Sequence, residues 1–251
     1  MKRNGLNPVA QTGFASAAAY DTTPWEGGAK IVDLAAGTGK LTEVLAARAE
    51  KLEIIAVEPH DGMREQLEKK QLKGVTVVKG TAEDLTGIED NSIAAVTVAQ
   101  AFHWFAKIDA LKEIHRVLQP TGGLGMVWNI EDYNSPLSWK IHEGWETIMR
   151  DVIWSFDDAM PRFRHEKWKQ VFDSQSSSGD DPLFSLPLGE GIEEFETWLS
   201  KEDIWNRVRT LSQLAILEGE ELRKAASPFT YGRILLGQDR YRASLPPNDG
   251  G

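Results

Sequence analysis

Short apolar runs alternate with amphipathic segments along the first half of this chain, and the alternation limits the folds open to it. The runs predict strands, and the segments between them predict helices. Strands joined by helices at this spacing form βαβ units, so we expect an α/β fold with a doubly wound, mostly parallel sheet. The expected elements are strand Ile31–Ala35, helix Lys40–Ala49, strand Glu53–Val57, helix His60–Gln71, strand Val75–Lys79, a short helix, strand Ile93–Ala99, helix Ala106–Leu118 and strand Leu124–Ile130.

The pattern changes after Asp132, where strand signals become shorter and tryptophan more frequent. A polar stretch at 174–181 predicts a surface loop. Leu183–Leu188 has the composition of an edge strand, since a proline in a sheet is tolerated at an edge. Helices are expected over Glu193–Leu199 and Lys201–Leu217, the second with Ser200 as its N-cap.

Composition limits the class of ligand. The chain of 251 residues carries 28 Lys and Arg against 38 Asp and Glu, a formal net charge of −10, which disfavours nucleic-acid and anionic-membrane surfaces. It has no cysteine, which excludes disulfides and thiolate metal sites. No apolar stretch approaches the length of a membrane span, and the first residues lack the apolar core of a signal peptide. We therefore expect a cytoplasmic protein with a small-molecule ligand.

The segment Ile31–Lys40 predicts a buried strand that breaks into a glycine turn and then a helix. Gly37 and Gly39 permit backbone angles and close approaches that a side chain would block. The N–H groups and positive dipole end of the following helix favour a carboxylate or phosphate at the turn. A nucleotide-like ligand is therefore expected here.

An acidic residue, Glu58, ends the second expected strand 25 positions after Asp33. A carboxylate in this place can accept hydrogen bonds from both hydroxyls of a ribose. Nicotinamide-binding and S-adenosylmethionine-binding proteins share this arrangement. A dinucleotide fingerprint beginning at Gly37 would need Gly or Ala at position 42, where Thr42 stands, so an NAD(P)-dependent oxidoreductase is the weaker alternative.

Four motifs in register resemble the class I S-adenosylmethionine-dependent methyltransferases, in particular the type 11 small-molecule group. The resemblance covers Phe14 to Asn129, and more loosely Trp139 to Leu217. It implies a Rossmann-like sheet and S-adenosylmethionine as cofactor, with S-adenosylhomocysteine as product. The motifs are Val32-Asp-Leu-Ala-Ala-Gly-Thr-Gly39, Ala56-Val-Glu-Pro-His60, Gly80-Thr-Ala-Glu83 and Ala99-Gln-Ala-Phe-His-Trp-Phe105.

The resemblance implies cofactor contacts at the carboxyl ends of the strands, which is also where ligands of doubly wound sheets bind. It places the backbone from Ala35 through Gly37 and Thr38 to Gly39 against the amino-acid end of the cofactor, and Glu58 against the ribose. Pro59 and Met63 lie on one face of the adenine, and Thr81, Ala82 and Glu83 border its edge. Gln100, Ala101 and Phe102 lie near the sulfonium, and Asp33, which precedes the turn, is a further cofactor contact.

Methyl transfer needs alignment of the reacting atoms and exclusion of water more than covalent help. His103 follows the fourth expected strand and is the candidate catalytic base or positioning donor; a core role for this histidine is the alternative. Candidate acceptor contacts are Tyr20, Trp104, Trp128 and Trp205, whose aromatic faces suit a cationic sulfur or an apolar acceptor. No histidine pair has metal-ligand spacing, so no metal is expected.

The chain departs from the family where Thr22–Gly28 replaces a longer helical segment before the first strand. That departure favours the first alternative to a methyltransferase, a cofactor-binding protein with lost or changed chemistry. We expect an N-terminal arm over 1–28, a cofactor-binding Rossmann-like core over 29–135, a helical cap with sheet-edge elements of the same domain over 136–230, and a C-terminal tail over 231–251. The leading hypothesis is methyl transfer to oxygen, nitrogen or sulfur of a small metabolite, with no nucleic-acid or membrane partner and no indication of oligomeric state.

Overall fold

The computed structural model describes residues 27–141, 144–175, 182–193, 197–230 and 241–243. The chain divides into two compact units. Unit 1 comprises Met1–Asn129 and Lys167–Glu190, and unit 2 comprises Ile130–Glu166 and Gly191–Gly251. The expected N-terminal arm and C-terminal tail lie almost wholly outside the described residues.

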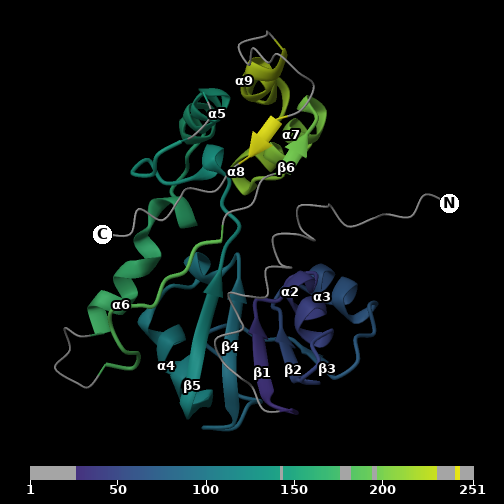
Figure 1. Ribbon diagram of the computed structural model, residues 1–251, viewed down its shortest axis with the longest axis vertical. Coiled ribbons are helices and arrows are strands. Elements are labelled where there is room, and N and C mark those ends of the chain that lie inside the picture. Colours follow the sequence, from purple (N-terminus) through teal and green to yellow (C-terminus); the bar gives the residue numbers. More distant parts are fainter. Residues whose placement is uncertain (1–26, 142–143, 176–181, 194–196, 231–240, 244–251) are drawn as a thin grey trace. The chain divides into compact units, whose positions relative to one another are not determined.

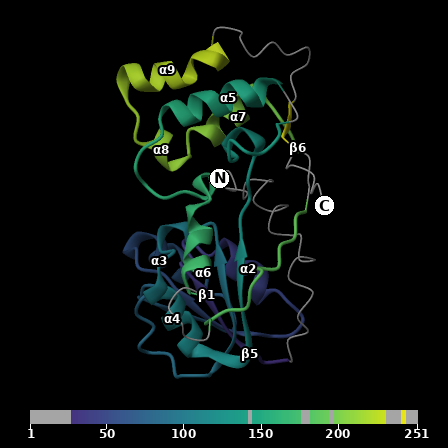
Figure 2. The same ribbon diagram turned by 90° about the vertical axis from the view of Figure 1, so that its left-hand side faces the viewer.

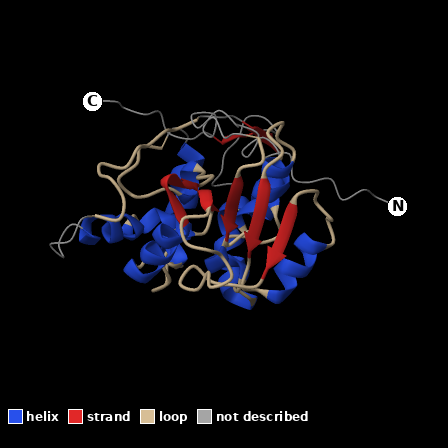
Figure 3. Ribbon diagram, turned by 90° about the horizontal axis from the view of Figure 1, so that it is seen from below, coloured by secondary structure: helices blue, strands red, loops and turns tan. Residues whose placement is uncertain are grey.

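Unit 1 is built on a five-stranded sheet in the order β3-β2-β1-β4-β5, visible from right to left in Figure 1. All four neighbouring pairs are parallel, which confirms the predicted sheet. Figure 3 shows the strands in red and the helices in blue. The strands are β1 (Lys30–Leu34), β2 (Glu53–Val57), β3 (Val75–Val78), β4 (Ile93–Ala99) and β5 (Leu118–Val127).

The strand order reverses between β1 and β4, and this position is the switch point of the sheet. From β1 the chain adds β2 and β3 on one side, then crosses to β4 and adds β5 on the other. At a switch point, the segments that follow the two neighbouring strands run to opposite faces of the sheet. The carboxyl ends of β1 and β4 therefore border a crevice suited to a ligand. The Rossmann-like doubly wound fold is thus the architecture of unit 1.

Helices cover the sheet of unit 1 because their apolar stripes match its buried strands. The first strand is buried at Ile31, Val32 and Leu34, as expected for a strand covered on both faces. Leu41 and Leu45 of the first helix join Ile31 in one apolar cluster. The helices of the unit are α2 (Lys40–Ala46), α3 (Asp61–Glu68), α4 (Ile108–Val117) and α6 (Gln170–Gln175), with short 3₁₀ turns η2 (Phe102–Trp104) and η5 (Lys167–Lys169).

Two predictions for unit 1 were wrong because side chains hydrogen-bond to backbone groups that regular secondary structure would otherwise pair. No helix forms between β3 and β4: the N–H of Leu85 donates to Glu113 Oε1 over 2.8 Å, so it is not paired within a helix. The predicted edge strand Leu183–Leu188 is irregular, because the side-chain amide of Gln175 bonds both the N–H and the carbonyl of Phe184.

The fifth strand begins earlier than predicted. We expected Pro120 and the glycines after it to separate helix from strand, with the strand starting at Leu124. Instead Leu118 pairs with Ile93, and Gly123 pairs with Ala95. The breaking residues are accommodated in a register shift within β5, as in a bulge.

Unit 2 has its own helical core, whose helices Figure 2 shows together. Its apolar cluster includes Tyr133, Met149, Ile153 and Val208, each almost wholly buried. The elements are η3 (Asp132–Asn134), α5 (Gly144–Ser155), η4 (Phe163–His165), α7 (Lys201–Val208), α8 (Ser212–Ala215), α9 (Gly219–Thr230) and the antiparallel pair β6 (Thr197–Leu199) and β7 (Tyr241–Ala243).

The helix boundaries of unit 2 were predicted in part. Ser200 is the N-cap of α7, as predicted, and its hydroxyl accepts from the N–H of Asp203 over 3.1 Å. The expected single helix Lys201–Leu217 is two helices, α7 and α8. The expected helix over Glu193–Leu199 was wrong at its end, where β6 pairs with a strand more than forty positions later. Among the described residues, no helix is long and apolar enough to cross a lipid bilayer.

Candidate functional site

Glu58, the residue after β2, connects two motifs at the carboxyl edge of the sheet. Its Oε2 accepts from the N–H of Gly37 and its Oε1 from the N–H of His60, both over 2.8 Å. The residue is only 5% exposed. A carboxylate has about four lone-pair sites, so two remain for a ligand's hydroxyl groups. The glycine turn and the acidic strand end therefore form one structure.

The glycine turn packs closely against α3, which explains its residue types. Gly39 has a left-handed backbone, and a Cβ built on it would lie 2.2 Å from Cδ1 of Leu67. The Cβ position of Gly37 lies 4.0 Å from the sulfur of Met63, so this predicted contact residue does reach the turn. The N–H of Gly37 is used by Glu58 and that of Gly39 by the carbonyl of Ala36, so both groups donate within the protein.

Two residues without the freedom of glycine adopt left-handed backbones at the switch point. Ala35, after β1, has a φ of 57°, and Gln100, after β4, has a φ of 62°. Such a conformation costs about 1–2 kcal/mol per residue and is concentrated at functional sites. The Gln100 side chain donates to the carbonyl of Asn129 over 3.2 Å, which ties the ends of β4 and β5 together.

Asp33 is a buried acid beneath the turn. Its Oδ2 accepts a 2.6 Å hydrogen bond from the Thr42 hydroxyl, and Oδ1 has no hydrogen-bond partner among the described residues. Burial raises the pKa of Asp33 to about 7; the nearby charge of Glu58 adds to the rise, and the bond from Thr42 opposes it. An unsatisfied buried carboxylate oxygen of this kind fits a bound cationic or hydrogen-bond-donating group.

The connection from β3 to β4 carries the predicted adenine-edge residues and is held by α4. Ala82 is buried, whereas Thr81 and Glu83 are exposed. Arg116 donates to the carbonyls of Leu85 and Ile88 over 3.1 and 3.0 Å. One arginine thus fixes the loop between the third and fourth strands.

Aromatic side chains gather where β4 and β5 end. The indole N–H of Trp128 donates to Nδ1 of His103 over 3.2 Å. Trp168 lies against Trp128 with ring centroids 4.7 Å apart, and the buried Phe102 packs edge-on against Trp168. The sequence analysis did not identify Trp168, because it lies 41 residues beyond the end of β5 and no local motif marks it.

The remaining predicted residues are less tightly grouped. Pro59 and Trp104 are exposed at this edge of unit 1, and Ala101 is the N-cap of η2. Trp205 lies on α7 and packs partly buried against the core of unit 2. Tyr20 lies outside the described residues. Within the described residues no group of three or more His, Cys, Asp and Glu side chains could hold a metal ion.

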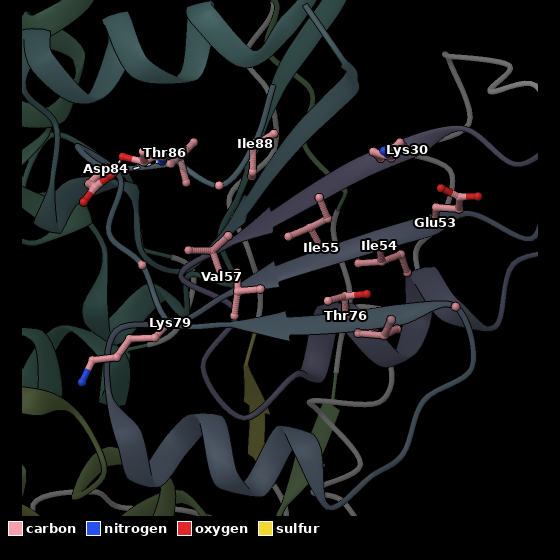
Figure 4. Close-up of a pocket in the computed structure, with 16 residues that line it drawn as sticks. Lys30, Glu53, Ile54, Ile55, Val57, Thr76, Lys79, Asp84, Thr86 and Ile88 are labelled. Carbon is pink, nitrogen blue, oxygen red and sulfur yellow. Dashed lines mark hydrogen bonds between the residues drawn. The ribbon is translucent and has the colours of Figure 1, made fainter. Parts of the chain in front are cut away.

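A separate hollow of about 690 Å³ lies on one face of β1, β2 and β3 (Figure 4). Ile55, Val57 and Thr76 project from the strands, and Thr86 and Ile88 come from the β3–β4 connection. None of the predicted cofactor positions lines this hollow. Part of its wall is the connection between β3 and β4, which forms no helix.

Comparison with known proteins bears on the same segment. Residues 32–126 match a family described as a methyltransferase domain. They begin in β1 and end in β5, so the match spans the glycine turn, Glu58 and the aromatic end of β4. The matched residues thus have the sequence pattern of a methyltransferase domain, here on a Rossmann-like sheet.

Relatives of the methyltransferase domain support the same assignment. A methyltransferase-like protein of Schizosaccharomyces pombe is 39% identical over 142 residues, which are 57% of this chain and 51% of that protein. A Mycobacterium tuberculosis protein named as an uncharacterized methyltransferase is 43% identical over 122 residues, 49% of this chain and 47% of that protein. The chain thus spans about half the length of the curated relatives it matches.

The fold around the methyltransferase domain also has a solved counterpart. The crystal structure of the YcgJ protein of Bacillus subtilis superposes with a TM-score of 0.57, covering 94% of each chain at 16% identity. At this identity the likeness concerns the fold alone. None of these comparisons supports the oxidoreductase alternative.

Proposed function

We propose that this chain binds S-adenosylmethionine at the carboxyl ends of β1, β2 and β4 and transfers its methyl group to oxygen, nitrogen or sulfur of a small metabolite. The main observation behind the proposal is the position of Glu58. Its carboxylate is held against the glycine turn by two hydrogen bonds and can accept further hydrogen bonds from a ligand. A ribose diol is the ligand group that such a carboxylate binds best.

The residues at this edge fit the other parts of the cofactor. The turn from Ala35 to Gly39 would hold the amino-acid end. The buried Oδ1 of Asp33, which has no hydrogen-bond partner among the described residues, would serve its ammonium group from beneath the turn. Pro59 and Met63 would lie along the adenine. The other proposed contacts are Thr38, Thr81, Ala82, Glu83, Gln100, Ala101 and Phe102.

When bound, S-adenosylmethionine supplies a methyl group on a positively charged sulfur, and a lone pair of the acceptor attacks that methyl group from the side opposite the sulfur. The protein positions the acceptor and the cofactor and excludes water. The strained backbones of Ala35 and Gln100 hold the two sides of the crevice at fixed places. His103 and Trp128 present polar and aromatic groups at the ends of β4 and β5, where we propose that the acceptor binds, with Trp104 beside them.

A small-molecule acceptor suits the charge of the chain. With a net charge of −10, the protein repels a polyanion such as nucleic acid. Contributions from Tyr20 and Trp205 to acceptor binding, the capping of the site by the helices of unit 2, and a cytoplasmic location stay predictions.

Two measurements test the proposal. Titration calorimetry should show binding of S-adenosylmethionine and S-adenosylhomocysteine and no binding of NADH. A coupled assay for S-adenosylhomocysteine release, run against a panel of small acids, amines, thiols and phenols, should then identify an acceptor. Binding without release on any acceptor would favour the cofactor-binding alternative, and binding of NADH alone would overturn the assignment.

A further inference from the structure

We propose that Trp128 is a positioning residue that keeps the ring of His103 neutral with its proton on Nε2. In the reaction proposed above, on which this last step rests, His103 then donates a hydrogen bond to the acceptor and does not remove a proton from it.

The chemistry of the indole group supports this proposal. An indole N–H can only donate a hydrogen bond, so the imidazole nitrogen that faces it must carry a lone pair. Here the facing atom is Nδ1 of His103, 3.2 Å from the Trp128 nitrogen. A neutral imidazole with a bare Nδ1 has its proton on Nε2. Protonating Nδ1 would break the bond to Trp128.

Packing keeps the indole of Trp128 in this orientation. Its ring lies on that of Trp168 with an interplanar angle of 33° and a centroid separation of 4.7 Å. Trp168 is only 6% exposed, and Phe102 packs against it at 89°. A rotation of Trp128 toward another partner would open this aromatic stack. The Trp128–His103 bond is therefore partly buried and is braced by this aromatic packing within unit 1.

The position of the pair connects it to the reaction. His103 lies in η2, which begins three positions after the end of β4, and Trp128 is the first residue after β5. Both are therefore at the carboxyl edge of the sheet, beside the strained Gln100. With Nδ1 occupied and Nε2 already protonated, the ring has no site to take up a proton while the Trp128 bond lasts. Any proton that the acceptor loses would go to solvent.

The test uses histidine ¹⁵N spectra of the full chain without ligand. In the wild-type protein, the ¹⁵N shifts of His103 should show the Nε2–H tautomer, with Nδ1 as acceptor. Trp128→Phe keeps an aromatic ring but removes the donor, so His103 should become a mixture of tautomers. Trp139→Phe, a half-buried tryptophan of unit 2, is the matched control and should leave the spectrum unchanged. His103→Gln identifies the signals.

A second measurement needs no variant. A scalar coupling across the hydrogen bond, between Nε1 of Trp128 and Nδ1 of His103, should be detectable in the wild-type protein. A wild-type Nδ1–H tautomer, absence of this coupling, or an unchanged tautomer in folded Trp128→Phe would each overturn the inference.

Calorimetry separates this inference from the proposed function. S-adenosylmethionine should bind wild type and Trp128→Phe within about threefold of each other, because Trp128 acts through His103 on the acceptor. Failure of the wild type to bind the cofactor, with the tautomer as expected, would overturn the methyltransferase proposal alone.

Discussion

Glu58 accepts a hydrogen bond from the N–H of Gly37, which joins the end of the second strand to the turn after the first. The two residues are 21 positions apart, and neighbouring parallel strands bring them together. A single carboxylate thereby stabilises the turn and offers its remaining lone pairs to a ligand.

Replacing Glu58 by alanine should weaken S-adenosylmethionine binding by about 10- to 150-fold, because removal of charge-assisted hydrogen bonds costs roughly 1.5–3 kcal/mol. Glu58→Gln, which keeps one accepting oxygen, should lose less. Glu53→Ala, at the exposed opposite end of the same strand, is the control and should bind normally. Calorimetry measures all three affinities, and equal binding by Glu58→Ala would refute the ribose assignment.

Replacing Gly39 by alanine should destabilise the protein by about 2–4 kcal/mol, from the left-handed backbone and overpacking together. The new Cβ would meet the Leu67 side chain at 2.2 Å. Gly123→Ala is the control, since no atom lies within 4 Å of its Cβ position. Urea unfolding gives both free energies. Equal stability of the two variants would show that the turn tolerates a side chain.

Asp33→Asn should change the pH dependence of stability. The native pKa of Asp33 is about 7, above its ordinary value of 3.8, so between these values the folded state holds a proton that the unfolded state has lost. Stability therefore falls as pH rises from about 4 to 7 and is level above that range. Relative to wild type, Asp33→Asn should gain stability toward pH 8, on the order of 2–4 kcal/mol, and gain nothing near pH 4.

Urea unfolding of wild type and Asp33→Asn at several pH values measures this difference. Asp61→Asn is the control, because this exposed acid has a lowered pKa from its bonds to Arg64 and Lys79 and should show no such gain. A constant difference between wild type and Asp33→Asn from pH 4 to 8 would rule out a raised native pKa.

Replacing Arg116 by alanine should loosen the β3–β4 connection. The side chain holds two carbonyls of that connection and pairs with Asp90 and Glu113. We expect faster hydrogen exchange over 81–90 and a loss of about 1–2 kcal/mol of stability, since each of the two bonds to a carbonyl contributes roughly 1 kcal/mol and the surface ion pairs add little. Lys112→Ala, an exposed position on the same helix, should leave exchange unchanged. If Arg116→Ala kept the wild-type protection against hydrogen exchange, contacts other than those of Arg116 would hold the β3–β4 connection.

Local sequence patterns predicted the fully buried strands and the elements that are stabilised by contacts between residues near in sequence. The bounds of β2 and β4 are those expected, because their apolar runs end at polar residues on both sides. The prediction failed where a residue distant in sequence determines the local backbone structure. The pairing of β6 with β7 and the capture of Phe184 by Gln175 leave no periodic trace in the chain.

The candidate site shows the same division. Gly37, Gly39 and Glu58 could be predicted because glycine and acid have fixed uses at strand ends. The bond between Trp128 and His103 and the stacking of Trp168 could not, since each depends on how separate segments fold back onto the sheet.

The discontinuity of unit 1 affects how the chain can be divided. The backbone leaves unit 1 after Asn129, returns at Lys167 and leaves again after Glu190. No single cut can release either unit as an intact fragment. A truncation at Asn129 would retain every position of the family match at 32–126 and still lose Trp168, the indole against which Trp128 rests. The smallest fragment that keeps this aromatic contact is therefore longer than the recognisable domain.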